Sequence, residues 1–279
     1  MAIVVITDST ADLPSSSIDR YNIKVVPLNI KIQDTVFKEG FGPSNQQYYH
    51  ILRTTPVFPT TSQPSAGDFV KEFSSLDSGD EAIVILISSH LSGTVQSAQM
   101  AKKMVSAKGN FKITIVDSET TTAALGFQVT KAAELAQSNP ELKTDDILAE
   151  IERIKRNQRL YFVVDNLEYL ARGGRIGQIS KHLGNILQVK PILHINHGKI
   201  EVFEKVRTKP RALTHILEEF ESNLHSVEKV AVIHVDALEE ALALQNKIQQ
   251  LYSGEVIIAE TGPVIGSHAG PGALGLVFY

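Results

Sequence analysis

Hydrophobic runs rich in valine and isoleucine alternate along this chain with longer segments that have helical spacing. The clearest runs span residues 3–6, 82–87 and 112–116. Each is followed by turn residues and then by a helical pattern, which is typical of βα units around a parallel sheet. Polar junctions at 88–94 and 117–122 follow the second and third runs. Open α/β sheets usually bind ligands at such strand ends, so we expect a site there.

A helix is predicted to begin at Ser65, in the region between the first two runs. Serine is a good N-cap, and Asp68 is favourable near the positive end of the helix dipole. The hydrophobic face of this helix consists of Phe69, Phe73 and Leu76. Pro64 disfavours helical geometry at the preceding residue, so we expect residues 61–63 to form an extended loop that leads to the helix start.

A further amphipathic helix is expected before a domain boundary. Its hydrophobic face consists of Ile147, Ile151 and Ile154. We place the boundary where this helix ends, so that residues 1–157 form one α/β domain and residues 158–279 form another. A chain of 279 residues is long for one domain, which favours the division.

The second half of the chain has a different pattern, which predicts antiparallel strands. Residues 191–195 and 199–206 flank Asn196-His197-Gly198, and the glycine supplies the positive φ that a β-hairpin turn needs. A further strand is expected at 230–235. We therefore predict an α/β fold with a largely parallel N-terminal sheet and a mixed C-terminal sheet that includes a hairpin.

Two helices and one loop are also predicted in the second half. One helix begins at residues 208–210, with Pro210 in its first turn. The other begins at Asp236, with Glu239 completing a capping box. Residues 262–272 contain several glycines and prolines, so we expect a loop that does not pack alone.

Composition excludes several classes of function. The chain contains no cysteine, which excludes disulfides, thiolate zinc sites and a cysteine nucleophile. Its net charge of −4 gives no basic surface for nucleic acid. The first residues lack the basic n-region of a signal peptide, and no apolar stretch is long enough to span a bilayer. We therefore expect a cytoplasmic protein whose contact with a membrane surface is at most transient.

The junction Ser92-Gly93-Thr94 is the best candidate for an anion site. A helix N-terminus offers free backbone N–H groups and partial positive charge, and glycine permits close approach. Thr61 and Ser62, on the expected loop, could add hydroxyl donors and hold a headgroup without a fixed cation. Hydroxyls and amides can satisfy one carboxylate, whereas phosphate sites usually add Lys or Arg. The alternative is that Ser92 only caps the helix.

A serine hydrolase is the main catalytic alternative. Ser92 would act as the nucleophile, His268 as the base, and Asp117 or Asp8 as the acid. The elbow sequence G-x-S-x-G is absent, and the position of His268 in its loop does not follow from the sequence. We therefore predict no catalytic residue. His268 could instead bond a bound carboxylate, or it could bond the backbone.

Other charged or metal-ligating side chains give weaker signals. His194 and His197 lie on the predicted hairpin with no adjacent acidic partner, so we treat them as non-ligands and predict no metal site. Arg172 and Arg175 flank two glycines that end a predicted helix as a left-handed cap, and Arg207 precedes another predicted helix. These arginines are candidates for binding an acidic or phosphorylated partner, although solvated charge is the commoner role.

Five segments taken together resemble the signatures of the DegV family, in the same order along the chain. The resemblance covers essentially the whole sequence, and five ordered matches are more specific than any one of them. The segments are TDSTADLP at 7–14, TSQPS at 61–65, SSHLSGTVQSA at 88–98, RGGRI at 172–176 and GSHAGPG at 266–272.

The resemblance implies two α/β domains with a long-chain fatty acid in a tunnel between them. It places the carboxylate against Thr61 and Ser92, with Ser62, Gly93 and His268 close by. Some members are the lipid-binding subunit of a bacterial fatty acid kinase, so the implied partner is a separate ATP-dependent kinase subunit.

On this interpretation the chain binds a lipid, needs no cofactor and has no catalysis of its own. Arg207, with Arg172 and Arg175 as weaker candidates, would engage the partner or support phosphotransfer. Two alternatives stay open. One is a stand-alone serine hydrolase that uses Ser92 and His268, and the other is a lipid-sensing regulatory module.

Overall fold

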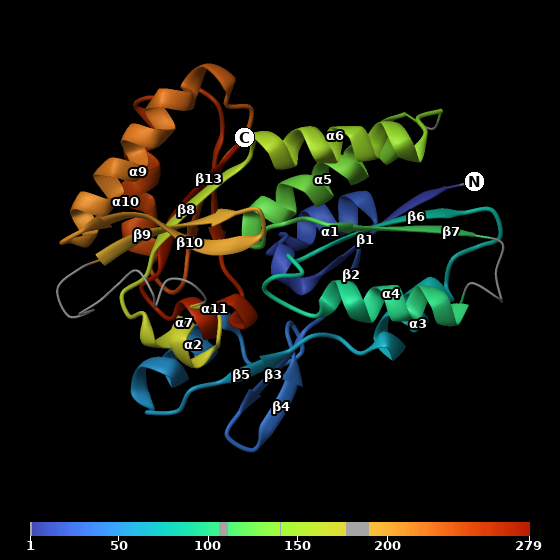
Figure 1. Ribbon diagram of the computed structural model, residues 1–279, viewed down its shortest axis with the longest axis horizontal. Helices are drawn as coiled ribbons and strands as arrows, with labels where there is room; N and C mark the ends of the chain where they lie inside the picture. Colours follow the sequence, from blue (N-terminus) through green and yellow to red (C-terminus); the bar gives the residue numbers. More distant parts are fainter. Residues whose placement is uncertain (1, 106–110, 140, 177–189) are drawn as a thin grey trace.

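A parallel sheet of four strands forms the N-terminal half of the computed structural model (Figure 1). The structure describes residues 2–105, 111–139, 141–176 and 190–279. The strand order is β2-β1-β6-β7. The strands are β1 (Ile3–Asp8), β2 (Lys24–Val26), β6 (Glu81–Leu86) and β7 (Lys112–Asp117). The three hydrophobic runs are therefore neighbouring parallel strands, as predicted.

Helices cover both faces of this sheet, because its strands are hydrophobic on both sides. Ile6 and Val84 pack with α3 and α4 on one face, whereas Val5 and Ile83 pack with α5 and α6 on the other. Ser65 caps α3, as predicted, by accepting from the backbone N–H of the third helical residue. The helices are α1 (Ser15–Tyr21), α3 (Ala66–Phe73), α4 (Thr94–Val105), α5 (Thr122–Ser138) and α6 (Thr144–Asn157).

A small antiparallel sheet lies below the parallel sheet in Figure 1, and the sequence patterns did not predict it. Its strand order is β4-β3-β5. Along the chain, helix α2 lies between β4 and β5. Thr61 pairs with Ile30 of β3, so the expected loop is a short strand that fixes the backbone of Thr61. The elements are β3 (Asn29–Ile32), β4 (Thr35–Lys38), α2 (Asn45–Thr54) and β5 (Thr60–Ser62).

A mixed sheet of six strands forms the C-terminal half, in the order β10-β9-β8-β13-β11-β12. Its neighbours are antiparallel except for β11 and β12. The predicted hairpin is confirmed, with His197 and Gly198 at positive φ in the turn. The strands are β8 (Arg159–Val163), β9 (Lys190–Asn196), β10 (Lys199–Val206), β11 (Val230–His234), β12 (Val256–Glu260) and β13 (Leu274–Phe278).

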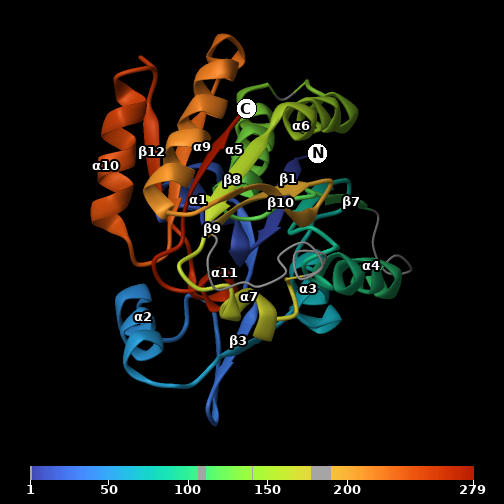
Figure 2. The ribbon, with the colours of Figure 1, turned by 60° about the vertical axis from the view of Figure 1, so that its left-hand side comes forward.

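Two helices, α9 (Lys209–Asn223) and α10 (Leu238–Gln249), cover one face of the mixed sheet (Figures 1 and 2). Thr208 caps α9 near the predicted start. The predicted capping box of α10 is wrong. Asp236 lies outside the helix at a φ of 48°, and its carboxylate binds Arg53 of α2 at 2.5 Å. Because the Asp236 side chain forms this tertiary ion pair, it does not cap α10 as the sequence pattern predicted.

The predicted loop at 262–272 is also wrong, because a helix occupies most of it. Helix α11 (Pro263–Ala269) begins with proline in its first turn, where a missing N–H does no harm. Two distant carboxylates accept from its free N–H groups: Asp12 from Gly262 at 2.9 Å and Glu39 from Val264 at 2.7 Å. Local sequence contains no hint of these partners.

The other face of the mixed sheet packs against the N-terminal half. A single hydrophobic cluster joins Tyr48 and Tyr49 of α2 to Phe162 of β8 and Val264 of α11. Gly174, at a φ of 72°, follows α7 (Glu168–Arg172) as the predicted left-handed cap. The predicted fold class is confirmed, whereas the division at residue 157 stays a prediction. Within the described ranges, every helix is too short or too polar to span a bilayer.

Candidate functional site

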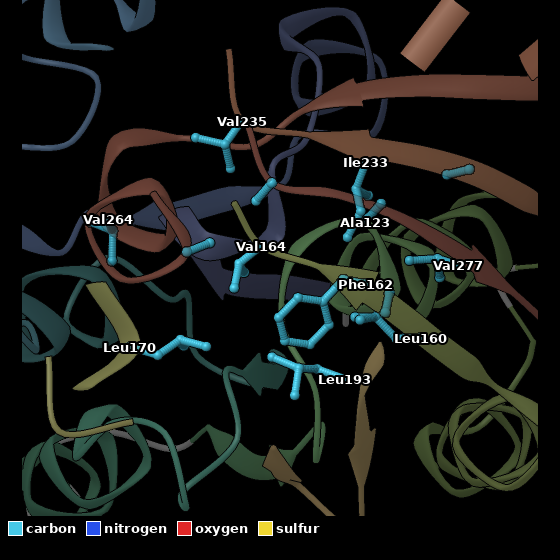
Figure 3. Packing of buried hydrophobic residues seen from close by; sticks show 14 of the residues in the cluster. Ala123, Leu160, Phe162, Val164, Leu170, Leu193, Ile233, Val235, Val264 and Val277 are labelled. Carbon is cyan, nitrogen blue, oxygen red and sulfur yellow. The ribbon is translucent and has the colours of Figure 1, made fainter. Parts of the chain in front are cut away.

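A largely apolar cavity lies between the mixed sheet and the elements that pack on its inner face. Figure 3 shows Phe162, Leu170, Val235 and Val264, from four separate segments, around a common interior region. These segments meet only in the folded protein. The buried apolar residues of the lining are Leu28, Ile87, Leu160, Phe162, Leu170, Ile233, Val235, Val264, Ala269, Ala273 and Leu274.

The cavity has one polar end, which reaches the surface. Thr61 Oγ1 lies 2.7 Å from Nε2 of His268, and Ser92 Oγ lies 2.8 Å from Oγ1 of Thr94. Thr61, Ser92 and His268 all line the cavity, as does the exposed Ser62. The structure thus brings together four of the predicted ligand-binding residues, from β5, the loop before α4, and α11. They form the polar end described below as the mouth.

His268 is neutral at physiological pH. Burial, together with the positive charge of Arg175, lowers the pKa of His268 to about 4. Its Nδ1 is buried, has no hydrogen-bond partner among the described residues, and lies against Gly173. A buried N–H without an acceptor is costly, so the tautomer with its proton on Nε2 is favoured. That proton is donated to Thr61, which leaves the hydroxyl proton of Thr61 available to a ligand.

Arg175 places a cation at this cavity, contrary to the expectation of a headgroup site without one. The side chain is part of the lining and only partly exposed. Its Nε donates to the carbonyl of Leu91 at 3.0 Å and its Nη1 to that of Gly173 at 2.6 Å. Burial lowers the pKa of the guanidinium, which nevertheless stays charged at neutral pH. A fixed positive charge beside hydroxyl donors favours a bound anion.

Gln63 is a mouth residue that sequence reasoning did not select. It lines the cavity, and its amide lies over Gly93, where an added Cβ would approach Nε2 of Gln63 to 2.8 Å. A side chain at 93 would therefore need the flexible end of Gln63 to move. Gly93 itself is not part of the described lining. The only sequence signal for Gln63 is the proline that follows it, which favours an extended backbone at Gln63.

Two of the predicted arginines lie away from the cavity lining. Arg172 is exposed, pairs with Glu168 at 2.7 Å, and lies over the ring of Phe58 at 4.0 Å from its centroid. Arg207 is exposed at the end of β10. Neither residue is placed to touch a molecule in the cavity, but both are accessible to a second protein.

The residues of the alternative hydrolase are not arranged as a triad. His268 bonds to Thr61 and not to Ser92, whose hydroxyl bonds to Thr94. Asp8 is fully buried and accepts from the backbone of Ile87 at 2.8 Å, and burial raises its pKa. Asp117 accepts from backbone N–H groups of residues 89 and 119. Neither acid therefore orients the imidazole.

The histidines of the hairpin lie outside any cluster of ligands. His194 stacks on Tyr161 with the ring centroids 6.1 Å apart, and His197 is exposed in the turn. Across the described ranges, no group of three or more His, Cys, Asp or Glu side chains is placed to hold a metal ion.

The fold and cavity define a class: α/β proteins in which an apolar cavity with a polar mouth lies on the inner face of a mixed sheet. The model of the family described as "Uncharacterised protein, DegV family" matches residues 2–279. The chain belongs to the DegV family.

Relatives and solved structures support this membership along the full length. A DegV domain-containing protein of Clostridium acetobutylicum is 37% identical, covering 100% of this chain and 98% of the relative. The crystal structure of DegV, a fatty acid binding protein from Bacillus subtilis, superposes with a TM-score of 0.91 at 35% identity, covering 100% and 99% of the two chains. A Thermus thermophilus family member, described by its fatty acid binding, has a TM-score of 0.88 at 31% identity over 100% and 99%.

Proposed function

We propose that this protein binds a long-chain fatty acid, with the carboxylate at the mouth and the acyl chain in the apolar cavity. The observation that carries the proposal is the distribution of polarity: Thr61, Ser92, Arg175 and His268 gather in one part of the lining, and most of the rest consists of buried apolar side chains. The buried polar exceptions are Thr121, Thr122, His234 and Thr261. The two solved family members described as fatty acid binding support the same ligand class.

The mouth suits one carboxylate. The hydroxyls of Thr61 and Ser92 are donors, and Arg175 supplies the compensating charge. Because His268 is neutral, it acts through the hydroxyl of Thr61 and adds no second charge. Burial of the acyl chain would supply most of the affinity, at about 0.8 kcal/mol for each methylene before ordering costs.

The protein, on this proposal, acts in the cytoplasm without catalysis of its own and presents its acid to a separate ATP-dependent kinase subunit. The lack of catalysis is supported by the residues of the alternative hydrolase, which do not form a triad, because neither Asp8 nor Asp117 reaches His268. The exposed, accessible arginines at 172 and 207 support a protein partner that carries phosphate.

Extraction of the purified protein tests the ligand directly. The protein is denatured, and the solvent-soluble material is identified and quantified by mass spectrometry. We expect one or a few long-chain acids in near-stoichiometric amount. An empty extract, together with failure of the delipidated protein to take up added stearic or oleic acid, contradicts the proposal.

Arg207 provides a test of the kinase partner. An Arg207→Ala variant should bind fatty acid with unchanged affinity, because the side chain lies outside the cavity lining, but should lose at least about tenfold in acyl-phosphate formation with the kinase subunit. Arg156→Ala, which removes another exposed arginine on α6, is the control. Equal rates for both variants would remove Arg207 from the partner surface. A partner that responds to lipid without phosphorylating it would instead favour the regulatory module.

A further inference from the structure

Helix α11 connects a pair of carboxylates to the mouth of the cavity. At the start of the helix, two backbone N–H groups donate to Asp12 at 2.9 Å and to Glu39 at 2.7 Å. Near its end, His268 bonds to Thr61 at the mouth. The same helix supplies other residues of the lining, which are Val264, Ile265 and Ala269. A displacement of α11 would therefore change both the cavity wall and the position of His268.

The two carboxylates lie close together, and no cation accompanies them. Both lie against Gly262, where an added Cβ would approach Oε1 of Glu39 to 2.6 Å and Oδ1 of Asp12 to 3.2 Å. The ionisable groups of neighbouring elements that interact with the pair are Asp8 of β1, Glu260 of β12, and Tyr48 and Tyr49 of α2. Within the described part of the chain, none of these partners can neutralise two negative charges.

This setting makes the ionisation of both carboxylates unfavourable. Burial raises the pKa of Glu39 to about 7, and burial together with the charge of Glu39 raises that of Asp12. Two carboxylates that share a site lose their protons one after the other. One negative charge suits the positive end of a helix dipole, whereas two like charges repel each other strongly where water is excluded. The second ionisation should therefore loosen the start of α11.

We propose that the pair of Asp12 and Glu39 is a proton-controlled support for α11, and that loss of a proton from this pair weakens binding of the fatty acid. The inference rests on the proposed function and adds a mode of regulation to it. The protein retains its acid below neutral pH and releases it more readily above. Because linkage is reciprocal, binding of the acid near neutral pH is accompanied by proton uptake.

The affinity for oleic acid as a function of pH tests this coupling. Displacement of a fluorescent acid from the delipidated full-length protein is measured between about pH 5.5 and 8.5, and circular dichroism verifies that the protein stays folded. We expect a loss of affinity of about tenfold, which corresponds to a pKa about one unit higher for the pair in the complex. Across this range His268 is neutral and Arg175 is charged, so these two mouth residues do not titrate.

Two variants assign the pH dependence to the pair. Glu39→Gln should remove it, because the amide keeps an acceptor for the helix and does not titrate. Glu221→Gln, which removes an exposed acid of α9, is the matched control and should keep the profile of the unmodified protein. Titration of the ligand itself is common to both variants, so it does not contribute to the difference between them.

A second measurement needs no substitution. Calorimetry of the unmodified protein with oleic acid at about pH 7.5, in buffers of different ionisation enthalpy, should show uptake of about half a proton for each bound acid. Uptake of this size is the expected consequence of a pKa that rises from about 7 to about 8 on binding.

The possible outcomes separate this inference from the proposed function. If oleic acid binds with the same affinity at every pH, or without proton uptake, the inference fails while fatty acid binding stands. A pH profile that persists in Glu39→Gln also overturns it. If no long-chain acid binds at any pH, the proposed function fails, and this inference fails with it.

Discussion

Single residues at the mouth decide how the carboxylate would be held. Thr61→Val and Ser92→Ala, combined in one protein, remove two hydroxyl donors that line the same end of the cavity. Each lost charge-assisted hydrogen bond costs about 1.5–3 kcal/mol, so affinity for a long-chain acid should fall by a factor of about 100 or more. Titration calorimetry with stearic acid measures the change.

Thr60→Val is the control for this pair, because Thr60 is an exposed neighbour on the same strand. It should leave affinity unchanged. Equal losses in the control and in the double variant would show that β5 is merely sensitive to substitution. Unchanged affinity in the double variant would refute the assignment of both hydroxyls.

Gly270, near the site, combines a backbone conformation that favours glycine with a close side-chain contact. It ends α11 at a φ of 76° and ψ of 156°, and a Cβ there would approach the ring of Tyr169 to 2.4 Å. Gly270→Ala should therefore lower the free energy of unfolding by about 2 kcal/mol or more. Gly67→Ala, in the exposed first turn of α3, meets only ordinary contacts and should raise it slightly. Denaturant titrations of both variants give the comparison, and similar destabilisation would contradict it.

At the scale of elements, helix α11 depends on two carboxylates that lie far away in sequence. Burial raises the pKa of Glu39 to about 7, and burial together with the charge of Glu39 raises that of Asp12. One oxygen of each carboxylate is bonded to the helix N-terminus, while the other is buried without a partner among the described residues. The folded protein therefore retains protons here that the unfolded chain would release.

This proton retention predicts a pH dependence of stability. The stabilisation from Glu39 is fully present below its unfolded pKa, near 4.5, and is lost as pH rises through about 7. Between pH 5 and 8 the unmodified protein should thus lose up to about 3 kcal/mol more than a Glu39→Gln variant, which keeps the acceptor but does not titrate. Urea titrations across this range measure the difference. Parallel pH profiles would show that Glu39 does not titrate in this way.

The sequence predicted regular elements well where their causes are local. Hydrophobic runs identified β1, β6 and β7, and Gly198 identified the hairpin turn. Prediction from sequence failed where residues distant in the chain determine the local structure. Helix α11 is capped by Asp12 and Glu39, and Asp236 binds Arg53 and does not form its predicted cap. Local patterns do not contain that information.

The candidate site, likewise, could be predicted from the sequence only in part. The family resemblance implied that Thr61, Ser92 and His268 lie close together, and all three line the mouth. The apolar walls could not be predicted, because Phe162, Leu170 and Val264 resemble ordinary core residues until the fold brings them around one space. Thr121 and Thr122 belong to a predicted polar junction, but only the structure shows that their hydroxyls are buried without a partner in the part of the chain that it describes.

For the molecule as a whole, the cavity makes ligand binding and stability inseparable. Its lining combines Leu28 and Ile87 of the N-terminal half with Phe162 and Ile233 of the C-terminal half, so a bound acid adds contacts to both. A long-chain acid at 100 times its Kd should stabilise the fold by about 2.7 kcal/mol, which corresponds to a rise in Tm of about 5 °C.

Calorimetry of delipidated protein with and without stearic acid checks this expectation. The methyl ester, which keeps the chain but cannot present a carboxylate to Arg175, should produce a smaller rise. Equal shifts for acid and ester would mean that the mouth contributes nothing to recognition. A shift confined to one of two separate transitions would mean that the ligand stabilises only one half.

The distant caps of α11 also bear on the order in which the chain acquires its structure during synthesis. Asp12 and Glu39 leave the ribosome more than two hundred residues before the helix that they cap. The acceptors can therefore be in place, in a folded N-terminal half, when Pro263 emerges. A C-terminal fragment made alone would lack Asp12 and Glu39. The helix that carries His268 would then form only after this fragment associates with the N-terminal half.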